Sequence, residues 1–183
     1  MRVFFGESRV HTAQSVCIVS ANVYGNMRTI ETTIDVDATP ADVWATLTDF
    51  ESYPEWNPFV TAIEGTPTAG DRLDIRIEPP EGRGRGFKPR VTAADPGERL
   101  AWLGRLGVPG LFDGRHEFRL EELDDGRTRL HHSESFSGLL VGLLLDEANI
   151  RAGFEAMNEA LRARVEGTAQ TTATETRDGG VAA

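Results

Sequence analysis

The sequence predicts an α+β fold in which an antiparallel sheet of about seven strands packs against one long C-terminal helix, with two short helices after the first strand. Three observations support this prediction. Residues 59–136 alternate like strands almost throughout, residues 139–165 end in an apolar stripe with helical spacing, and a helix start follows the first alternating segment. The length of 183 residues suits a single domain with tails.

The first elements are a strand and a short helix. Residues 29–36 alternate between apolar and polar side chains, which is typical of a half-buried strand. Thr39 suits the N-cap of a helix and Pro40 its first position, so we expect a helix to begin here. The proline-rich segment 53–58 allows only a short turn or helix.

Six more strands should follow, each flanked by Gly, Pro or Asp. We expect them at residues 60–64, 71–77, 87–94, 99–103, 114–123 and 127–136, with a loop at 79–86. The chain then enters a long helix whose apolar stripe must pack on an apolar surface. This stripe consists of Ile150, Phe154, Met157, Leu161 and Val165.

The pattern changes near both ends of the chain. Residues 1–27 have no sustained periodicity, and we expect an extension that is disordered or not native, with Met27 as the true start. The domain then spans residues 28–166, and the Thr/Ala/Gly-rich residues 167–183 should form a disordered tail. The single cysteine, Cys17, lies in the extension, which excludes a disulfide framework and a Cys-based zinc site in the domain.

The charge balance is acidic. Nineteen Lys and Arg residues face 29 Asp and Glu residues, giving a formal net charge of −10, and Lys88 is the only lysine. This balance argues against a nucleic-acid partner, and it indicates either a GC-rich genome or adaptation to high salt. No apolar run reaches the ~18–20 residues needed to span a membrane, so we expect a cytoplasmic protein without stable membrane insertion.

Several local motifs are shared with a known superfamily. They lie at residues 38–44, 53–58, 100–104, 136–140 and 153–161. Through these motifs and its element order, the segment 28–166 resembles the SRPBCC superfamily of START-like helix-grip proteins, which includes polyketide cyclase/dehydrase-like and Bet v 1-like domains. The resemblance implies a deep, mostly apolar cavity between the sheet and the C-terminal helix. It implies neither a cofactor nor a universal catalytic residue.

The most informative polar residues lie on the last two strands. The turn Asp124-Asp125-Gly126 fits a three-residue hairpin loop, which places His116 opposite Glu134 and Phe118 opposite His132. By the two-residue period of a strand, these side chains share the apolar face that the helix should cover.

Two interpretations of these polar residues remain open. His116, His132 and Glu134 could anchor a ligand or act as an acid/base pair inside the cavity. Alternatively, the histidine and the glutamate only satisfy each other across the strands, or a shift in register turns both toward water. Catalytic residues therefore remain unassigned, with these three as candidates.

Other candidate cavity residues are large and mostly apolar, as in sites for small molecules. The full ligand-binding set is Trp56, Ile75, Phe87, Trp102, Phe112, His116, Phe118, His132, Glu134, Phe136 and Phe154. We expect the glycine-rich apolar segment 104–112 to form a lid or to tuck onto the helix. No metal site is expected, because His131 and His132 point to opposite faces of one strand.

These observations favour binding of a small hydrophobic or amphipathic ligand, as in a carrier or sensor, over catalysis. The enzymatic alternative is a lyase of the polyketide cyclase/dehydratase kind in which His116 or His132 exchanges protons and Glu134 orients it. A third possibility is a protein-interaction module that uses the apolar lid. We expect a monomer or a weak homodimer.

Overall fold

The structure, a computed structural model, describes residues 27–178, with side chains to residue 168. Its strands are β1 (Arg28–Val36), β2 (Val60–Glu64), β3 (Asp74–Ile77), β4 (Arg85–Phe87), β5 (Arg90–Asp95), β6 (Arg99–Arg105), β7 (Asp113–Glu122) and β8 (Thr128–Ser137). Its helices are α1 (Pro40–Thr48), the 3₁₀ turn η1 (Phe50–Ser52), α2 (Tyr53–Trp56), α3 (Val141–Leu144) and α4 (Glu147–Asp178). Of the expected extension at residues 1–27, residues 1–26 lie outside the described residues.

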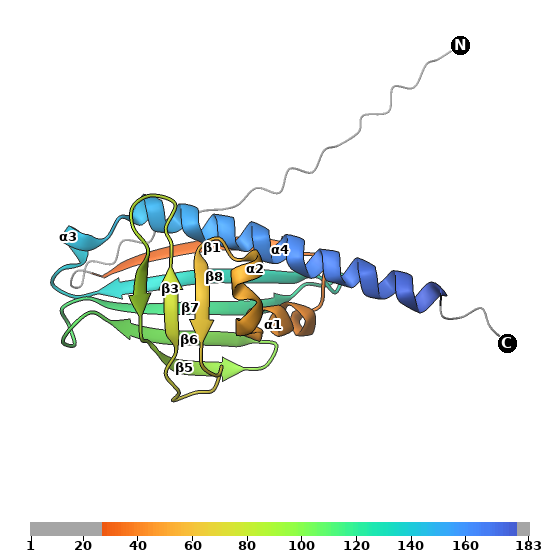
Figure 1. The fold of residues 1–183 in the computed structure, drawn as a ribbon, viewed down its shortest axis with the longest axis horizontal. Coiled ribbons are helices and arrows are strands. Elements are labelled where there is room, and N and C mark those ends of the chain that lie inside the picture. The colour runs from red at the N-terminus through yellow and green to blue at the C-terminus, as the bar shows by residue number, and fades with distance from the viewer. Residues whose placement is uncertain (1–26, 179–183) are drawn as a thin grey trace, which may run out of the picture.

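The strands form two antiparallel sheets, which confirms the α+β class. Five strands pair in the order β1-β8-β7-β6-β5, and three pair in the order β2-β3-β4. The long helix α4 runs along the sheets beside β1, while α1 and α2 lie between β1 and β2 in sequence (Figure 1). This is the helix-grip arrangement expected from the sequence.

The strand count corrects the sequence prediction in one place. Residues 87–94, expected as one strand, are divided between β4 and β5. Pro89 stands at the division, and proline interrupts a ladder because it has no N–H to donate. β4 also begins at Arg85, so the connection expected at 79–86 is shorter, and the described residues contain eight strands instead of about seven.

The helical end of the chain also differs from the expected single helix. Leu145 has an extended backbone, with φ −86° and ψ 118°, and separates α3 from α4. The Asp146 side chain then accepts a hydrogen bond from the Asn149 N–H at 3.1 Å, as an N-cap does. α4 continues to Asp178, so the segment expected to be a disordered tail is helical as far as that residue.

Local signals explain the remaining elements. Thr39 accepts a hydrogen bond from the Asp42 N–H and caps α1 at Pro40, as expected. Gly126 has a φ of +82°, which suits the last residue of the β7–β8 turn.

None of the helices among residues 27–178 is both long enough and apolar enough to cross a bilayer.

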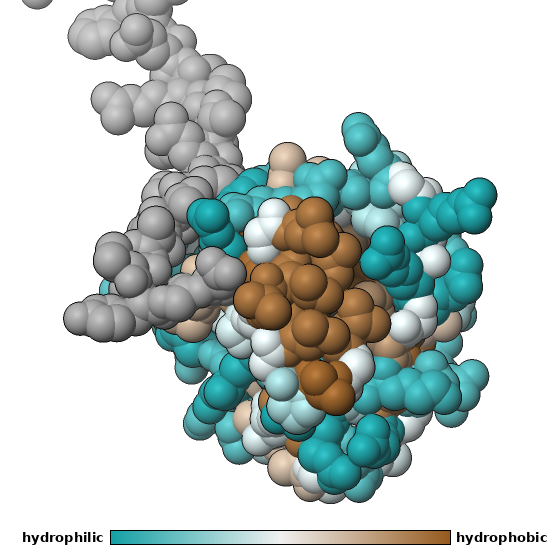
Figure 2. Space-filling view, turned by 90° about the vertical axis from the view of Figure 1, so that its left-hand side faces the viewer, coloured by the Kyte–Doolittle hydropathy of each residue, from teal (hydrophilic) through white to brown (hydrophobic). Residues whose placement is uncertain are grey.

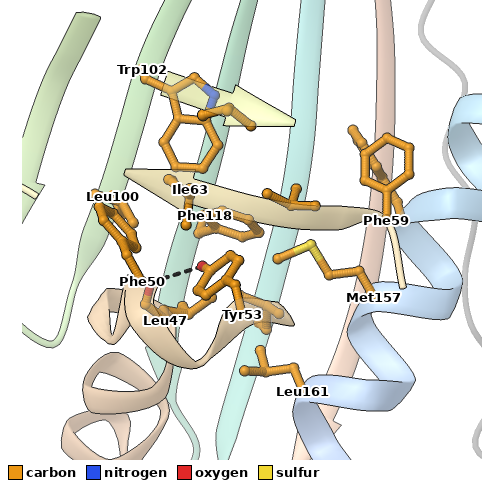
Figure 3. Packing of buried hydrophobic residues seen from close by; sticks show 14 of the residues in the cluster. Leu47, Phe50, Tyr53, Phe59, Ile63, Leu100, Trp102, Phe118, Met157 and Leu161 are labelled. Atoms are coloured by element: carbon orange, nitrogen blue, oxygen red, sulfur yellow. Dashed lines mark hydrogen bonds between the residues drawn. The ribbon is translucent and has the colours of Figure 1, made fainter. Parts of the chain in front are cut away.

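The core fills the space between the five-stranded sheet, the α1–α2 segment, β2 and α4. Figure 3 shows side chains from these elements pointing toward one another, including Tyr53, Phe118 and Met157. The Tyr53 hydroxyl donates to the Leu47 carbonyl at 2.8 Å, so this buried polar group is satisfied. The apolar stripe of α4 is buried at Phe154, Met157, Leu161 and Val165, which explains why this helix packs on the sheet.

Candidate functional site

The β7–β8 hairpin positions the polar residues of the site. Its register pairs His116 with Glu134 and Phe118 with His132, which confirms the pairing expected from the turn. Both histidines are buried, at 2% and 0% exposure, so they lie on the inner face of the sheet. The alternative in which the register is shifted and His116 and Glu134 both face water is therefore wrong.

His116 is held between a carboxylate and an aromatic ring. Its Nδ1 lies 3.2 Å from Glu134 Oε2, across the two strands. The indole of Trp102, on the neighbouring strand β6, stacks on the imidazole with ring centroids 4.7 Å apart and planes 2° from parallel. The ring can therefore neither tilt nor move away from the carboxylate without losing a contact.

A second set of polar groups lies behind His116. His132 Nε2 is 3.0 Å from His116 Nε2, and His132 Nδ1 is 2.8 Å from Oδ1 of Asn158 on α4. The Asn158 Nδ2 donates to the Thr32 hydroxyl on β1 at 2.9 Å. The ring of Phe154 stacks on His132 with a centroid distance of 3.8 Å, so α4 closes this part of the interior.

Burial sets the charge state of His132. Its pKa is held well below the ordinary value, first because burial disfavours the charged ring and then because His116 lies beside it. The hydrogen bond to Asn158 opposes this shift but does not reverse it. His132 is therefore neutral at physiological pH.

A cavity of about 320 Å³ adjoins the His116–Glu134 pair. Its wall is built from the start of β2, from β3, β4, β6, β7 and β8, and from α3 and the start of α4. The cavity contacts seven of the residues expected from the sequence, namely Ile75, Phe87, Trp102, Phe112, His116, Glu134 and Phe136. A mostly apolar wall with a few polar groups, among them this inner pair, is typical of a small-molecule site.

Four expected ligand-binding residues do not line this cavity. Phe118, His132 and Phe154 are fully buried and pack on one another, because α4 covers that part of the sheet. Trp56 lies on α2, packs against the Tyr53 ring and donates to the Ser52 hydroxyl at 3.3 Å. These side chains belong to the core, and only His132 remains connected to the site, through His116.

The cavity opens at the end of the molecule where α3 lies. Figure 2 shows an apolar patch on this end, and Leu106 and Leu144 belong both to the cavity wall and to the exposed apolar residues. The other exposed large apolar residues of this end are Val108, Leu139 and Leu143. The expected lid segment 104–112 thus contributes Leu106 and Phe112 to the wall and Val108 to the surface.

The β3–β4 connection lines the outer part of the cavity and is hydrogen-bonded to α4. The Glu81 N–H donates to Asn149 Oδ1 at 3.0 Å, and the Asn149 side-chain amide donates to the Glu81 carbonyl at 2.8 Å. Arg83 and Arg85 follow on this connection and line the mouth, where both are exposed. The outer part of the cavity therefore carries charges of both signs, since exposed Arg105, Glu81 and Asp146 also line it, while the inner wall carries the histidine and the glutamate.

Sequence reasoning missed several residues of the site. Asn158 follows Phe154 by one helical turn, so a polar residue on the apolar stripe of α4 was the available signal. Thr32 alternates with Ile30 and Ile34 on the inner face of β1, which was a second signal. The mouth residues Arg83, Arg85 and Asn149 gave none, because their positions depend on how the two sheets and α4 come together.

Among residues 27–178, no group of three or more His, Cys, Asp or Glu side chains is placed to hold a metal ion. The inner wall instead offers a hydrogen-bonded pair, the imidazole of His116 and the carboxyl group of Glu134. This pair can donate, accept or exchange a proton with a molecule in the cavity.

The sequence of the domain matches the model of a known protein family. The model of a family described as polyketide cyclase / dehydrase and lipid transport matches residues 27–166. No sequence among the curated proteins matches the chain.

Several solved structures share the fold. A START superfamily protein from Mycobacterium smegmatis has 20% identity and a TM-score of 0.59, covering 76% of this chain and 98% of its own. Protein CV1439 from Chromobacterium violaceum has 21% identity and a TM-score of 0.61, with coverages of 75% and 96%. A Thalictrum norcoclaurine synthase point mutant, solved with a transition-state analogue, has 15% identity and a TM-score of 0.60, with coverages of 80% and 99%.

Proposed function

The chain belongs to the polyketide cyclase / dehydrase and lipid transport family, as an SRPBCC-type domain, and from this premise we propose that it binds a small hydrophobic or amphipathic molecule in the cavity beside His116 and Glu134. The observation that carries the proposal is the cavity itself, a mostly apolar space whose inner wall holds the pair of buried His116 and partly buried Glu134. Apolar walls supply affinity and a few polar groups supply orientation.

The volume limits the size of the ligand. About 320 Å³ lies at the small end of the range of roughly 300–1,000 Å³ typical of ligand cavities. A compact molecule of one to three rings, or a short chain, fits this space better than a large lipid. The exposed apolar residues around the mouth, such as Leu106 and Leu144, give such a molecule an apolar route inward.

Binding can be tested with a neutral fluorescent probe, N-phenyl-1-naphthylamine, whose emission rises in apolar surroundings. Gly104 lines the cavity on the same face of β6 as Trp102, and a Cβ added to it meets only ordinary contacts near 3.8 Å. The variant Gly104→Leu therefore places a side chain in the cavity and should weaken probe binding at least tenfold.

The matched control is Leu143→Ser, which removes an exposed leucine of the patch but does not touch the cavity wall. It should bind the probe like the unaltered protein. If Leu143→Ser abolishes binding while Gly104→Leu does not, the probe binds the surface and the cavity proposal is wrong.

A second candidate function is supported by the His116–Glu134 pair, which has the groups needed for acid/base chemistry of the cyclase or dehydratase kind. The two functions differ in what happens to the ligand. A carrier releases its ligand unchanged, whereas a lyase converts it at a rate that depends on pH and is lost in His116→Gln. Mass spectrometry of the ligand before and after incubation with the protein distinguishes them.

A further inference from the structure

The polar groups behind the cavity form one continuous chain. It runs from Glu134 through His116 and His132 to Asn158 and Thr32, with steps of 3.2, 3.0, 2.8 and 2.9 Å. The chain joins β8, β7, α4 and β1, and all its members except Glu134 are buried. A buried chain of this kind leaves little freedom in where the protons lie.

The donor and acceptor of each hydrogen bond in this chain follow from its Thr32 end. The Thr32 hydroxyl donates to the His132 carbonyl at 3.4 Å, so its oxygen accepts the bond from the Asn158 amide N–H. Asn158 consequently presents its Oδ1, an acceptor only, to His132 Nδ1. His132 must carry a proton on Nδ1.

The neutral state of His132 fixes the next step. A neutral imidazole with its proton on Nδ1 has a lone pair on Nε2. That lone pair faces His116 Nε2 at 3.0 Å, so His116 must donate through an Nε2–H. The remaining nitrogen of His116, Nδ1, faces Glu134 Oε2.

One proton must then lie between His116 and Glu134. A lone pair on Nδ1 facing an ionised carboxylate would repel it, so either the imidazole is doubly protonated or the carboxyl group is neutral. In both states the pair is neutral overall, and both ring nitrogens of His116 are hydrogen-bonded within the protein. His116 thus has no N–H left for a ligand.

Glu134 Oε1 is the group of this pair that remains available. Among residues 27–178 it has no hydrogen-bond partner, and it is not one of the fully buried unpaired atoms. It lies over Gly114, where an added Cβ would come within 2.5 Å of it, so the absence of a side chain at 114 makes room for this oxygen. Glu134 lines the cavity and its side chain is 16% exposed.

We propose that the cavity selects an apolar molecule carrying a hydroxyl group, an alcohol or a phenol, whose O–H donates to Glu134 Oε1 while Glu134 and His116 share one proton. A ligand carboxylate at the same place would face the lone pairs of Oε1 and is disfavoured. The exposed charges of the outer cavity have both signs, with Arg83 and Arg85 beside Glu81 and Asp146, and none of them belongs to the inner pair. This inference rests on the proposed binding function and specifies its ligand class.

Three compounds that share one ring system test the ligand class: naphthalene, 2-naphthol and 2-naphthoate, titrated at pH 7.5 and followed by NMR. We expect 2-naphthol to bind about tenfold more tightly than naphthalene, the usual gain from a hydrogen bond to a charged or charge-assisted group, and 2-naphthoate to bind more weakly than naphthalene. In Glu134→Leu the advantage of 2-naphthol should disappear while naphthalene still binds. The control Glu121→Leu, on the outer face of β7, should keep it.

The outcomes separate the two proposals. Equal affinity for 2-naphthol and naphthalene, or an advantage of 2-naphthol that survives Glu134→Leu, overturns the ligand class and leaves the cavity function intact. Failure of all three compounds to bind overturns the binding function and this inference with it.

The proton positions can be measured without any ligand. In a ¹⁵N-labelled sample, the ring nitrogens of His132 should show a neutral imidazole protonated at Nδ1, and those of His116 should show a proton on Nε2. The variant His131→Gln removes the signal of the outer histidine and simplifies assignment. A charged His132, or one protonated at Nε2, overturns the proposed proton arrangement.

Discussion

At the residue scale, His132 shows how a buried ring is made compatible with the core. It is surrounded by Phe154 and Asn158 of α4, His116 and Phe118 of β7 and Thr32 of β1. Of these groups only His116 is also ionisable, and a positive charge on it would oppose a second charge on His132, which lowers the pKa of His132. The ring is therefore tolerated because it is neutral and both of its nitrogens are paired.

This lowered pKa gives a pH dependence of stability. The unfolded chain takes up a proton at His132 near pH 6.5 while the folded protein does not, so the free energy of unfolding falls as pH drops below about 6.5, by up to about 1.4 kcal/mol per pH unit. Urea unfolding between pH 7.5 and 5 measures this slope. His132→Gln should have a shallower slope, although it is less stable at pH 7.5.

The control for this measurement is His131→Gln, because His131 lies on the outer face of β8 near Glu31 and Glu121. This variant retains His132 and should keep the steep slope. Equal slopes in His132→Gln and the unaltered protein would show that His132 is not the proton-binding group.

At the element scale, the hairpin β7–β8 was predictable because local chemistry determines it. Gly126 closes a three-residue turn, the turn fixes the register, and the register places His116 opposite Glu134. The separation of Phe118 and His132 from the cavity was not predictable, because it depends on where Phe154 of α4 docks. Periodicity shows which face of a helix is buried but not which strand residues it covers.

Two other differences between the predicted and the observed elements also have local causes. Pro89 divides residues 87–94 into β4 and β5, and the extended backbone at Leu145 separates α3 from α4. Composition alone predicted disorder after residue 166, whereas α4 continues to Asp178. Thr- and Gly-rich sequence lowers helix propensity without excluding a helix that continues from a well-packed one.

Two glycines of α4 test, respectively, how this helix packs and how stable it is beyond the core. A Cβ on Gly153 would overlap the ring of Phe59, which is buried and packs edge-on against Phe154. Gly153→Ala should therefore lower the free energy of unfolding, since overpacking costs about 1–3 kcal/mol and the gain in helix propensity is only about 1 kcal/mol. Thermal or urea unfolding measures the change.

Gly167→Ala is the matched control on the same helix. An added Cβ there meets nothing within 4 Å, so the variant should gain roughly 0.5–1 kcal/mol from helix propensity alone. A stable Gly153→Ala variant would contradict the packing of Phe59 on the helix. No gain in Gly167→Ala would contradict a stable helix at that position.

At the scale of the whole molecule, the acidic charge lies on the outside and the inner His116–Glu134 pair is neutral overall. Asp74, Glu117 and Glu155 lie on outward positions, and the first two pair with Lys88 and Arg99. Glu134 is the inward exception, and the shared proton neutralises it together with His116. The net charge of −10 is therefore a property of the solvent-facing surface and acts on stability and association more than on ligand choice.

The surface charge should make the melting temperature depend on salt. The size of this dependence distinguishes a GC-rich genome from adaptation to high salt as the source of the acidic composition. Salt screens the mutual repulsion of a chain with net charge −10, so the melting temperature should rise between 10 mM and 1 M NaCl. Screening about 1 kcal/mol of repulsion corresponds to a rise of roughly 2–4 °C at this chain length. The ion pairs of the surface, such as Asp35–Arg129, weaken at the same time and reduce the rise.

The triple variant Glu51→Gln, Glu122→Gln, Glu155→Gln provides the control, because these three carboxylates are exposed and form no ion pair with another described residue. It reduces the magnitude of the net charge from −10 to −7, and its melting temperature should depend less on salt than that of the unaltered protein. Differential scanning calorimetry at both salt concentrations measures the two slopes. Stability in 10 mM NaCl with a gain of only these few degrees would favour a GC-rich genome as the source of the composition, whereas unfolding in dilute buffer would favour adaptation to high salt. Equal salt slopes in the two proteins would contradict the electrostatic explanation, because the removed charges could then not be its source.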